Sequence, residues 1–319
     1  MEENALKNKA PAGVLRRMFV KPKSDGLMLI EGHCAQVLDD IDNWRVCLVS
    51  AAAGFGKTSL LARYCQELDE REGFMTLWAT LDERDRDPAT LARALFFMFG
   101  DVSTRIQDLS YELKEETQLD NLLVEFINLT DELCDPAITY CLFIDMYEYA
   151  ACDEVDELVL FLNRNLSDNF RFVISSTYFS SAFDDILLFS PVVEIHTADL
   201  VMPSQRLDAS AREMLPEMSS EDIADMRRVY GSWPMAYTFA ALASKRTNSK
   251  SELRHMVDQY CERYFQKVVH DQIDENMQEF LLKTCMLEEM TPDLCDAVTQ
   301  SKQSSDILKY LASRNYFCQ

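Results

Sequence analysis

The chain has 319 residues and a mass of 36.7 kDa, which is long for one domain and favours two or three. Apolar residues make up 48% of it and charged residues 27%, with only 8 glycines and 9 prolines, a composition that excludes disordered, collagen-like and low-complexity proteins. With 31 basic against 54 acidic side chains the net charge is −23, so by itself the chain is a poor binder of nucleic acid or of anionic membranes.

Residues 1–26 are predicted to form an arm that precedes the first domain. The arm either lies on the surface of that domain or touches nucleic acid or a partner. The start of the chain lacks the apolar core of a signal peptide, and no apolar run is long enough to span a membrane, so we expect a cytoplasmic protein without membrane contact. The arm is locally basic, with Lys7, Lys9, Arg16, Arg17, Lys21 and Lys23.

Residues 27–203 are predicted to form an α/β domain with a parallel sheet flanked by helices. Apolar runs typical of buried strands alternate with helix-period stretches about five times, which favours parallel strands with helices on both faces. One helix should begin at Asp87, which is followed by Pro88, because Asp is a good N-cap and Pro suits the first turn. The expected strands are 46–51, 75–81, 140–145, 170–176 and 191–195, and other helical stretches are 58–68, 115–133, 154–165 and 182–188.

The strand pattern ends near residue 203. Residues 204–268 are predicted to form a helical domain, in which serines precede amphipathic runs and Pro234 opens another. Residues 269–319 contain three short helical segments in succession, as in a helix-turn-helix or winged-helix unit. Because the chain stops where a wing hairpin would begin, we expect this domain to be partial and residue 319 to be an engineered cut.

The ten cysteines lack paired spacing and histidine partners, and most lie inside apolar segments. This pattern predicts buried thiols in a reducing compartment rather than a disulfide framework or a zinc site.

The strongest motif is Val49-Ser-Ala-Ala-Ala-Gly-Phe-Gly-Lys-Thr-Ser, which follows a strand and opens a helix. A phosphate chain needs unobstructed backbone N–H groups at a helix N-terminus, where Gly54 and Gly56 let the backbone curl. Lys57 can reach the β- and γ-phosphate oxygens, and the hydroxyl of Thr58 can ligate Mg²⁺. Ala51 replaces the first glycine of the usual pattern. The predicted nucleotide-binding residues here are Ala53, Gly54, Phe55, Gly56, Lys57, Thr58 and Ser59.

An acidic residue at the end of a neighbouring strand should complete this site. Leu142-Phe-Ile-Asp145 supplies it, and Asp145 would serve Mg²⁺ through water. Hydrolysis also needs a carboxylate that orients or deprotonates the attacking water, and Met146 cannot do this. Glu148 could do so if the turn after the strand brings it back to the site. The candidate catalytic residues are therefore Asp145 and Glu148.

These segments, taken together, resemble the nucleotide-binding portion of the MalT-type, LuxR-family transcription regulators, which belong to the STAND class of signal-transducing NTPases. The similarity runs from about residue 27 to the end and depends on the shared order and spacing of the motifs. The motifs are the phosphate loop, Trp78-Ala-Thr-Leu-Asp-Glu, Asp87-Pro88, Leu142-Phe-Ile-Asp145, Asp168-Asn-Phe-Arg-Phe-Val-Ile-Ser-Ser, Gly231-Ser-Trp-Pro234, Ala240-Ala-Leu, Glu279-Phe-Leu-Leu-Lys-Thr, Leu294-Cys-Asp-Ala-Val-Thr and Leu311-Ala-Ser-Arg-Asn-Tyr-Phe.

The resemblance implies a P-loop domain, a helical domain and a winged-helix domain that close over ADP or ATP with Mg²⁺. It implies that Pro234 lies against the adenine, and Trp233 either helps to form that pocket or lies in the core. ADP would hold a resting form, and ATP with an inducer would favour self-association. DNA would be bound only through a helix-turn-helix beyond this chain, because residues 251–319 carry twelve acidic and seven basic side chains, a net charge of −5.

Some departures from the family pattern bear on hydrolysis. Met146 stands where many relatives have a second acid, and Thr177 stands where they have an arginine that senses the terminal phosphate. His33 is a candidate for the basic residue expected near the start of the domain, or a surface histidine. We therefore expect a nucleotide switch with slow or absent hydrolysis. The alternatives are a working ATPase of a signalling or defence system, completed by Glu148 or a neighbouring subunit, and an interaction scaffold that has lost nucleotide.

Overall fold

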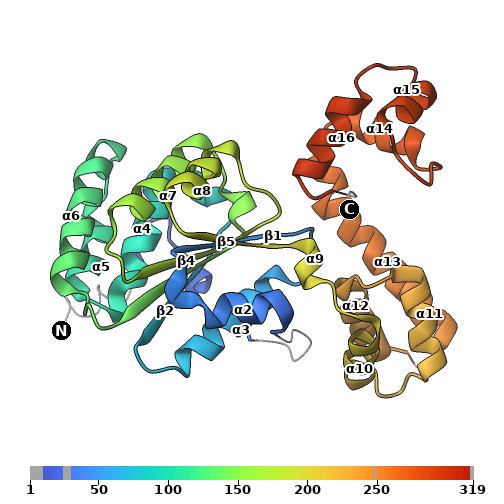
Figure 1. The fold of residues 1–319 in the computed structure, drawn as a ribbon, viewed down its shortest axis with the longest axis horizontal. Helices are drawn as coiled ribbons and strands as arrows, with labels where there is room; N and C mark the ends of the chain where they lie inside the picture. The colour runs from blue at the N-terminus through green and yellow to red at the C-terminus, as the bar shows by residue number, and fades with distance from the viewer. Residues whose placement is uncertain (1–9, 24–29, 248, 317–319) are drawn as a thin grey trace. The chain divides into compact units, whose positions relative to one another are not determined.

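The computed structural model describes residues 10–23, 30–247 and 249–316, and the chain divides into two compact units (Figure 1). The first unit contains residues 1–51 and 57–199, and the second contains residues 52–56 and 200–319. Lys7, Lys9 and the domain boundary predicted at residue 26 lie outside the described residues.

The first unit is built around a sheet of five strands, in the order β2-β3-β4-β1-β5, and every pair of neighbours is parallel. The predicted parallel sheet is thus confirmed. Strand β4 lies between β1 and β3, so the strand before the phosphate loop and the strand that ends in Asp145 do not pair directly. The bounds of the strands are β1 Val46–Ser50, β2 Phe74–Thr80, β3 Thr139–Asp145, β4 Phe170–Ser176 and β5 Val192–His196.

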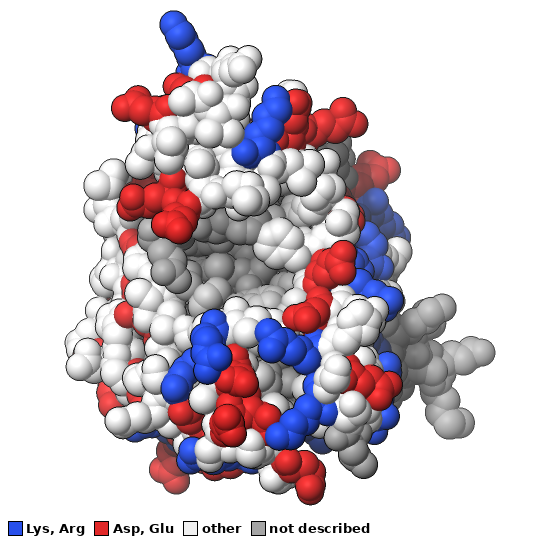
Figure 2. All heavy atoms as spheres, turned by 90° about the vertical axis from the view of Figure 1, so that its right-hand side faces the viewer, with Lys and Arg blue, Asp and Glu red and all other residues white. Residues whose placement is uncertain are grey.

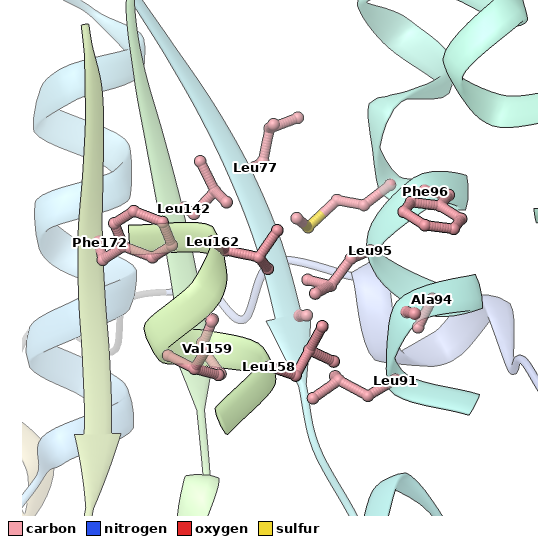
Figure 3. Close-up of a cluster of buried hydrophobic side chains, with 14 of the residues drawn as sticks. Leu77, Leu91, Ala94, Leu95, Phe96, Leu142, Leu158, Val159, Leu162 and Phe172 are labelled. Carbon is pink, nitrogen blue, oxygen red and sulfur yellow. The ribbon is translucent and has the colours of Figure 1, made fainter. Parts of the chain in front are cut away.

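Helices cover both faces of this sheet: α2 and α3 lie on one face, and α4 and α7 on the other (Figure 1). Side chains of α4 and α7, such as Leu95 and Leu162, pack with Leu142 and Phe172 of the strands in one buried cluster (Figure 3). The helices are α2 Gly32–Asp39, α3 Lys57–Asp69, α4 Pro88–Met98, α5 Thr104–Glu112, α6 Leu119–Leu133, α7 Asp153–Asn165 and α8 Asp184–Phe189, and the short α9 Thr197–Leu200 crosses the boundary between the units.

The predicted start of the helix after Asp87 is confirmed, since its side chain accepts a hydrogen bond from the backbone N–H of Thr90 and Pro88 lies in the first turn. Five of the cysteines in the described residues are buried, as their apolar neighbours predict: Cys34, Cys47, Cys65, Cys141 and Cys295. No described helix combines the length and the apolar character that crossing a bilayer requires.

The described part of the basic arm packs on the first unit. Val14 and Met18 are buried in its core. The Lys21 ammonium donates hydrogen bonds to Asp69 Oδ2 at 2.7 Å and to Thr76 Oγ1 at 2.6 Å, which fastens the arm to α3 and β2. This part of the arm is therefore a component of the first domain.

The second unit is helical throughout its described secondary structure. The helix α11 begins with a capping box, in which Ser219 and Asp222 each satisfy a backbone N–H of the other. Helices α14, α15 and α16 share a small core of Phe280, Cys295 and Leu311 and correspond to the three helices predicted for the end of the chain. The helices are α10 Ser204–Met214, α11 Ser220–Tyr230, α12 Pro234–Ser244, α13 Lys250–Val268, α14 Glu275–Thr284, α15 Pro292–Thr299 and α16 Ser304–Ser313.

Candidate nucleotide-binding site

The loop between β1 and α3 has the backbone conformation that a phosphate-binding loop requires. Gly54 (φ +82°) and Gly56 (φ +90°) both adopt the left-handed region, which is open to glycine and strained for other residues. Helix α3 begins immediately afterwards at Lys57, so the N–H groups of its first turn and the positive end of its dipole face the loop. The first turn of α3 contains no acidic residue that would compete with an anion. A helix N-terminus with this geometry is able to accept a phosphate group.

The ammonium of Lys57 is directed back into the loop, where it donates a hydrogen bond to the carbonyl oxygen of Ala51 at 2.7 Å. Burial lowers the pKa of Lys57, and the nearby carboxylates of Glu148 and Asp145 oppose this shift. The structure therefore brings three predicted site residues, Lys57, Asp145 and Glu148, close enough to interact electrostatically.

Asp145 ends β3 and has no exposed surface. Its Oδ1 accepts hydrogen bonds from the hydroxyl of Thr58, at 3.1 Å, and from the hydroxyl of Ser175, at 2.5 Å. Burial raises the pKa of Asp145, whereas these two hydroxyl groups and Lys57 act in the opposite direction. Ser175 is the last but one residue of β4, the strand between β1 and β3, and it holds the carboxylate from that side.

The second oxygen of Asp145, Oδ2, is buried and has no hydrogen-bond partner. An orphaned carboxylate oxygen beside a threonine hydroxyl is the donor set with which a P-loop protein holds Mg²⁺, together with phosphate oxygens and water. Within the described residues no three acidic, histidine or cysteine side chains gather into a group that could hold a metal ion. The residues present fit Mg²⁺.

The segment after Asp145 returns the chain to the site. Met146 adopts the left-handed conformation (φ 61°) and is 38% exposed. The 3₁₀ turn Tyr147–Tyr149 follows and places Glu148 near Lys57. Burial raises the pKa of Glu148, and Lys57 together with the backbone N–H groups of Glu148 itself and of Thr177 lower it. Its Oε2 is buried without a hydrogen-bond partner.

A buried carboxylate on α7 fixes this turn. Asp156 is 2% exposed and lies in the first turn of α7, where the helix dipole favours a negative charge. The Tyr147 hydroxyl donates to Asp156 Oδ1 at 2.5 Å, and the hydroxyl of Ser180 donates to Oδ2. Asp156 thus ties the segment after β3 to the segment after β4.

In the second unit, the indole of Trp233 lies against the loop residues 52–56. Its Nε1 donates a hydrogen bond to the carbonyl oxygen of Ala53 at 3.1 Å. A side chain at Gly54 would place its Cβ 2.5 Å from the same Nε1, so the close approach of the indole requires glycine there. Pro234 opens α12 directly after Trp233.

The remaining predicted residues have the following positions. Thr177 is 7% exposed and comes immediately after β4. His33 is exposed, and its Nε2 lies 3.0 Å from the carbonyl oxygen of Glu194. Phe55 is part of the loop and half-buried, and Ser59 lies in the first turn of α3.

No role was predicted from the sequence for Ser175 or Asp156. Ser175 and Ser176 form a polar pair at the end of the apolar run 170–176, and this pattern could have marked Ser175 as a site residue. Nothing local to the helix 153–165 distinguishes Asp156 from its acidic neighbours.

A parallel sheet with this strand order, a glycine-bearing loop that leads into a helix, and an aspartate on a nearby strand define the P-loop NTPase fold. In agreement with this, the structure is similar to that of a Walker-type ATPase of Pyrococcus abyssi, with a TM-score of 0.64 and 12% identity over 93% of each chain. At that identity the likeness concerns the fold.

The comparisons with known sequences point to MalT-type regulators. Residues 266–319 match the family model described as the MalT winged helix domain. The chain is 25% identical over 283 residues to the HTH-type transcriptional regulator MalT of Serratia proteamaculans, a match that covers 86% of this chain and 31% of the relative. It is 21% identical over 299 residues to that of Vibrio campbellii, covering 91% and 32%. The resemblance expected from the sequence, and the winged-helix part of the fold, are confirmed.

The chain spans about a third of the length of these curated relatives.

Proposed function

We propose that this chain is the nucleotide-binding switch module of a MalT-like transcriptional regulator, which binds ADP or ATP with Mg²⁺ and hydrolyses ATP slowly or not at all. The observation that carries the proposal is the cluster in which Thr58 and Ser175 hold Oδ1 of Asp145, while its Oδ2 is left without a partner beside Lys57. The loop backbone and Lys57 would hold the phosphates, and Thr58 and Asp145 would hold the metal.

The proposal includes the predicted division into a nucleotide domain at 27–203, a helical domain at 204–268 and a winged-helix domain at 269–319. Within the second unit, the contact of Trp233 with Ala53 supports a role of Trp233 and Pro234 at the adenine end of the nucleotide. Self-association in the ATP form and a cytoplasmic location belong to the same proposal.

We also propose that any DNA contact is made by a region outside this chain. Figure 2 shows basic and acidic side chains intermingled on the face that it presents, rather than one continuous basic surface. The segment 251–319, with a net charge of −5, would not neutralise phosphates. The helices of this segment are better suited to a contact within the protein.

The first experiment is a thermal unfolding titration with ADP and with ATP, each with and without Mg²⁺. A ligand that binds only the folded state stabilises it by about 2.7 kcal/mol when its concentration is 100 times Kd, so the unfolding temperature should rise with nucleotide concentration. Acid extraction of the purified protein should also release bound nucleotide. If extraction releases no nucleotide and neither ADP nor ATP changes the unfolding temperature, the switch proposal is wrong. That result would favour the interaction scaffold that has lost nucleotide.

A second candidate function, a working ATPase, is favoured by one observation. The carboxylate of Glu148 lies near Lys57 with Oε2 buried and unpartnered, which is where a group that positions the attacking water would be needed. Against it, Thr177 offers no positive charge for the terminal phosphate.

The two candidates differ in the effect of Glu148→Gln on steady-state turnover of Mg-ATP. For a working ATPase, loss of the base should reduce turnover by a factor of about 100. For the switch, turnover should be near background in both proteins. Glu157→Gln, on the exposed surface of α7, is the matched control. Rapid turnover in both the wild type and Glu148→Gln would contradict the slow switch, and it would also contradict a catalytic role for Glu148.

A further inference from the structure

The second unit contains a cavity of about 900 Å³ that is separate from the phosphate loop. It lies among α11, the end of α12, the start of α13 and the segment that follows α10, and all its lining residues fall between residues 214 and 257. This volume is within the range of about 300 to 1,000 Å³ that is usual for small-molecule sites.

The apolar part of the lining is rich in methionine. Met214, Met218 and Met226 contribute to it together with Leu253 and Val257. Methionine side chains are flexible and polarisable, and they adapt to apolar ligands of irregular shape. The cavity therefore suits an aliphatic or aromatic body.

The charged residues that line the cavity are divided between two walls. The wall formed by α12 and α13 contributes three basic side chains and no acidic one, whereas the wall formed by α11 and the segment before it contributes three acidic side chains and no basic one. The basic residues are Lys245, Lys250 and Arg254, and the acidic residues are Glu217, Asp222 and Asp225.

Ion pairs account for part of this charge. Lys250 contacts Asp222 at 2.7 Å, and Asp225 contacts Arg228 at 2.8 Å. Lys245 and Arg254 have no ion-pair partner among the described residues. These two cations lie on one wall of the cavity, and they give that wall a preference for an anion.

We propose that this cavity binds a small organic monoanion whose apolar body lies on the methionines and whose anionic group pairs with Lys245 and Arg254. Glu217 on the opposite wall disfavours a second negative charge on the ligand. The ligand chemistry is thus a carboxylate or sulfonate on an aliphatic or aromatic body, and the site would give this chain an effector input distinct from nucleotide.

The test uses the whole chain and the fluorescent probe 1-anilinonaphthalene-8-sulfonate, which has this chemistry. The probe should be displaced by decanoate at concentrations at which decanol and decyltrimethylammonium are ineffective. In Lys245→Met and in Arg254→Met the dissociation constant of decanoate should rise about ten-fold each, as expected for loss of a charge-assisted contact. Lys267 lies on the exposed part of α13 outside the cavity. Lys267→Met also removes one positive charge and should leave the dissociation constant of decanoate unchanged.

A blocking variant separates this site from other apolar surfaces. Val229 lines the cavity and is 48% exposed, so Val229→Trp should preserve the fold and reduce probe binding. Equal displacement by decanol and decanoate, or probe binding that is the same in wild type, Lys245→Met and Val229→Trp, would overturn the proposal. The nucleotide titration in the same variants should match wild type, which keeps a failure at this cavity distinct from a failure of the nucleotide site.

Discussion

Lys57→Ala is expected to weaken binding of ADP and ATP about 100-fold, as measured by calorimetric or thermal-shift titration. The ammonium is held in the phosphate loop by the carbonyl of Ala51 and faces two buried carboxylates, so it is already desolvated and directed toward the site. A buried charge-assisted contact to a phosphate is worth roughly 3 kcal/mol, which corresponds to this loss of affinity.

A second variant tests whether a positive charge at residue 57 is sufficient for nucleotide binding or whether the geometry of lysine is also needed. Lys57→Arg keeps the positive charge but presents a planar fork, and it should recover only part of the affinity. Lys267→Ala on α13 is the control for removal of a surface cation. Unchanged nucleotide affinity in Lys57→Ala, in a protein whose circular dichroism matches wild type, would rule out this loop as the phosphate site.

Asp156→Ala is expected to lower the free energy of unfolding by about 3 kcal/mol, measured by urea denaturation. The substitution leaves the hydroxyls of the buried Tyr147 and the half-buried Ser180 without their acceptor and opens a small cavity at the start of α7. Because Tyr147 belongs to the turn that carries Glu148, this variant should also loosen the carboxylate that faces Lys57.

Two matched variants separate these effects. Asp156→Asn keeps the shape and one acceptor oxygen, so it should lose less stability than Asp156→Ala. Glu157→Ala, exposed on the same helix, should change the free energy of unfolding by less than about 0.5 kcal/mol. If Asp156→Ala and Glu157→Ala unfold at the same urea concentration, the network does not stabilise the turn.

Much of the first domain could be predicted from the sequence because its strands are continuously apolar and sharply bounded. The strand predicted at 170–176 is β4, and the run that ends at Asp145 is β3 with one further residue at its start. The helices Gly32–Asp39 and Thr104–Glu112 were not predicted, since they are short.

The arrangement around Asp145 could be predicted only in part. Strand order depends on contacts between segments that are distant in the sequence, so the sequence did not indicate that Ser175 would lie beside Asp145. The position of Glu148 depends on a left-handed residue at Met146, and a methionine gives no sign of that conformation. The turn from β1 into α3 could be predicted because the glycines, the lysine and the threonine of the motif are contiguous.

The order of the strands also has a consequence for synthesis of the protein. β1 pairs with β4 on one side and with β5 on the other, so Val46 meets its partners only at Phe172 and Val192. After the loop that follows β1 has left the ribosome, most of the first domain must still be synthesised before β1 can pair with β4 or β5. The nascent chain therefore carries an exposed apolar segment over this interval, and the loop after β1 gains its folded surroundings only once β4 and β5 have emerged.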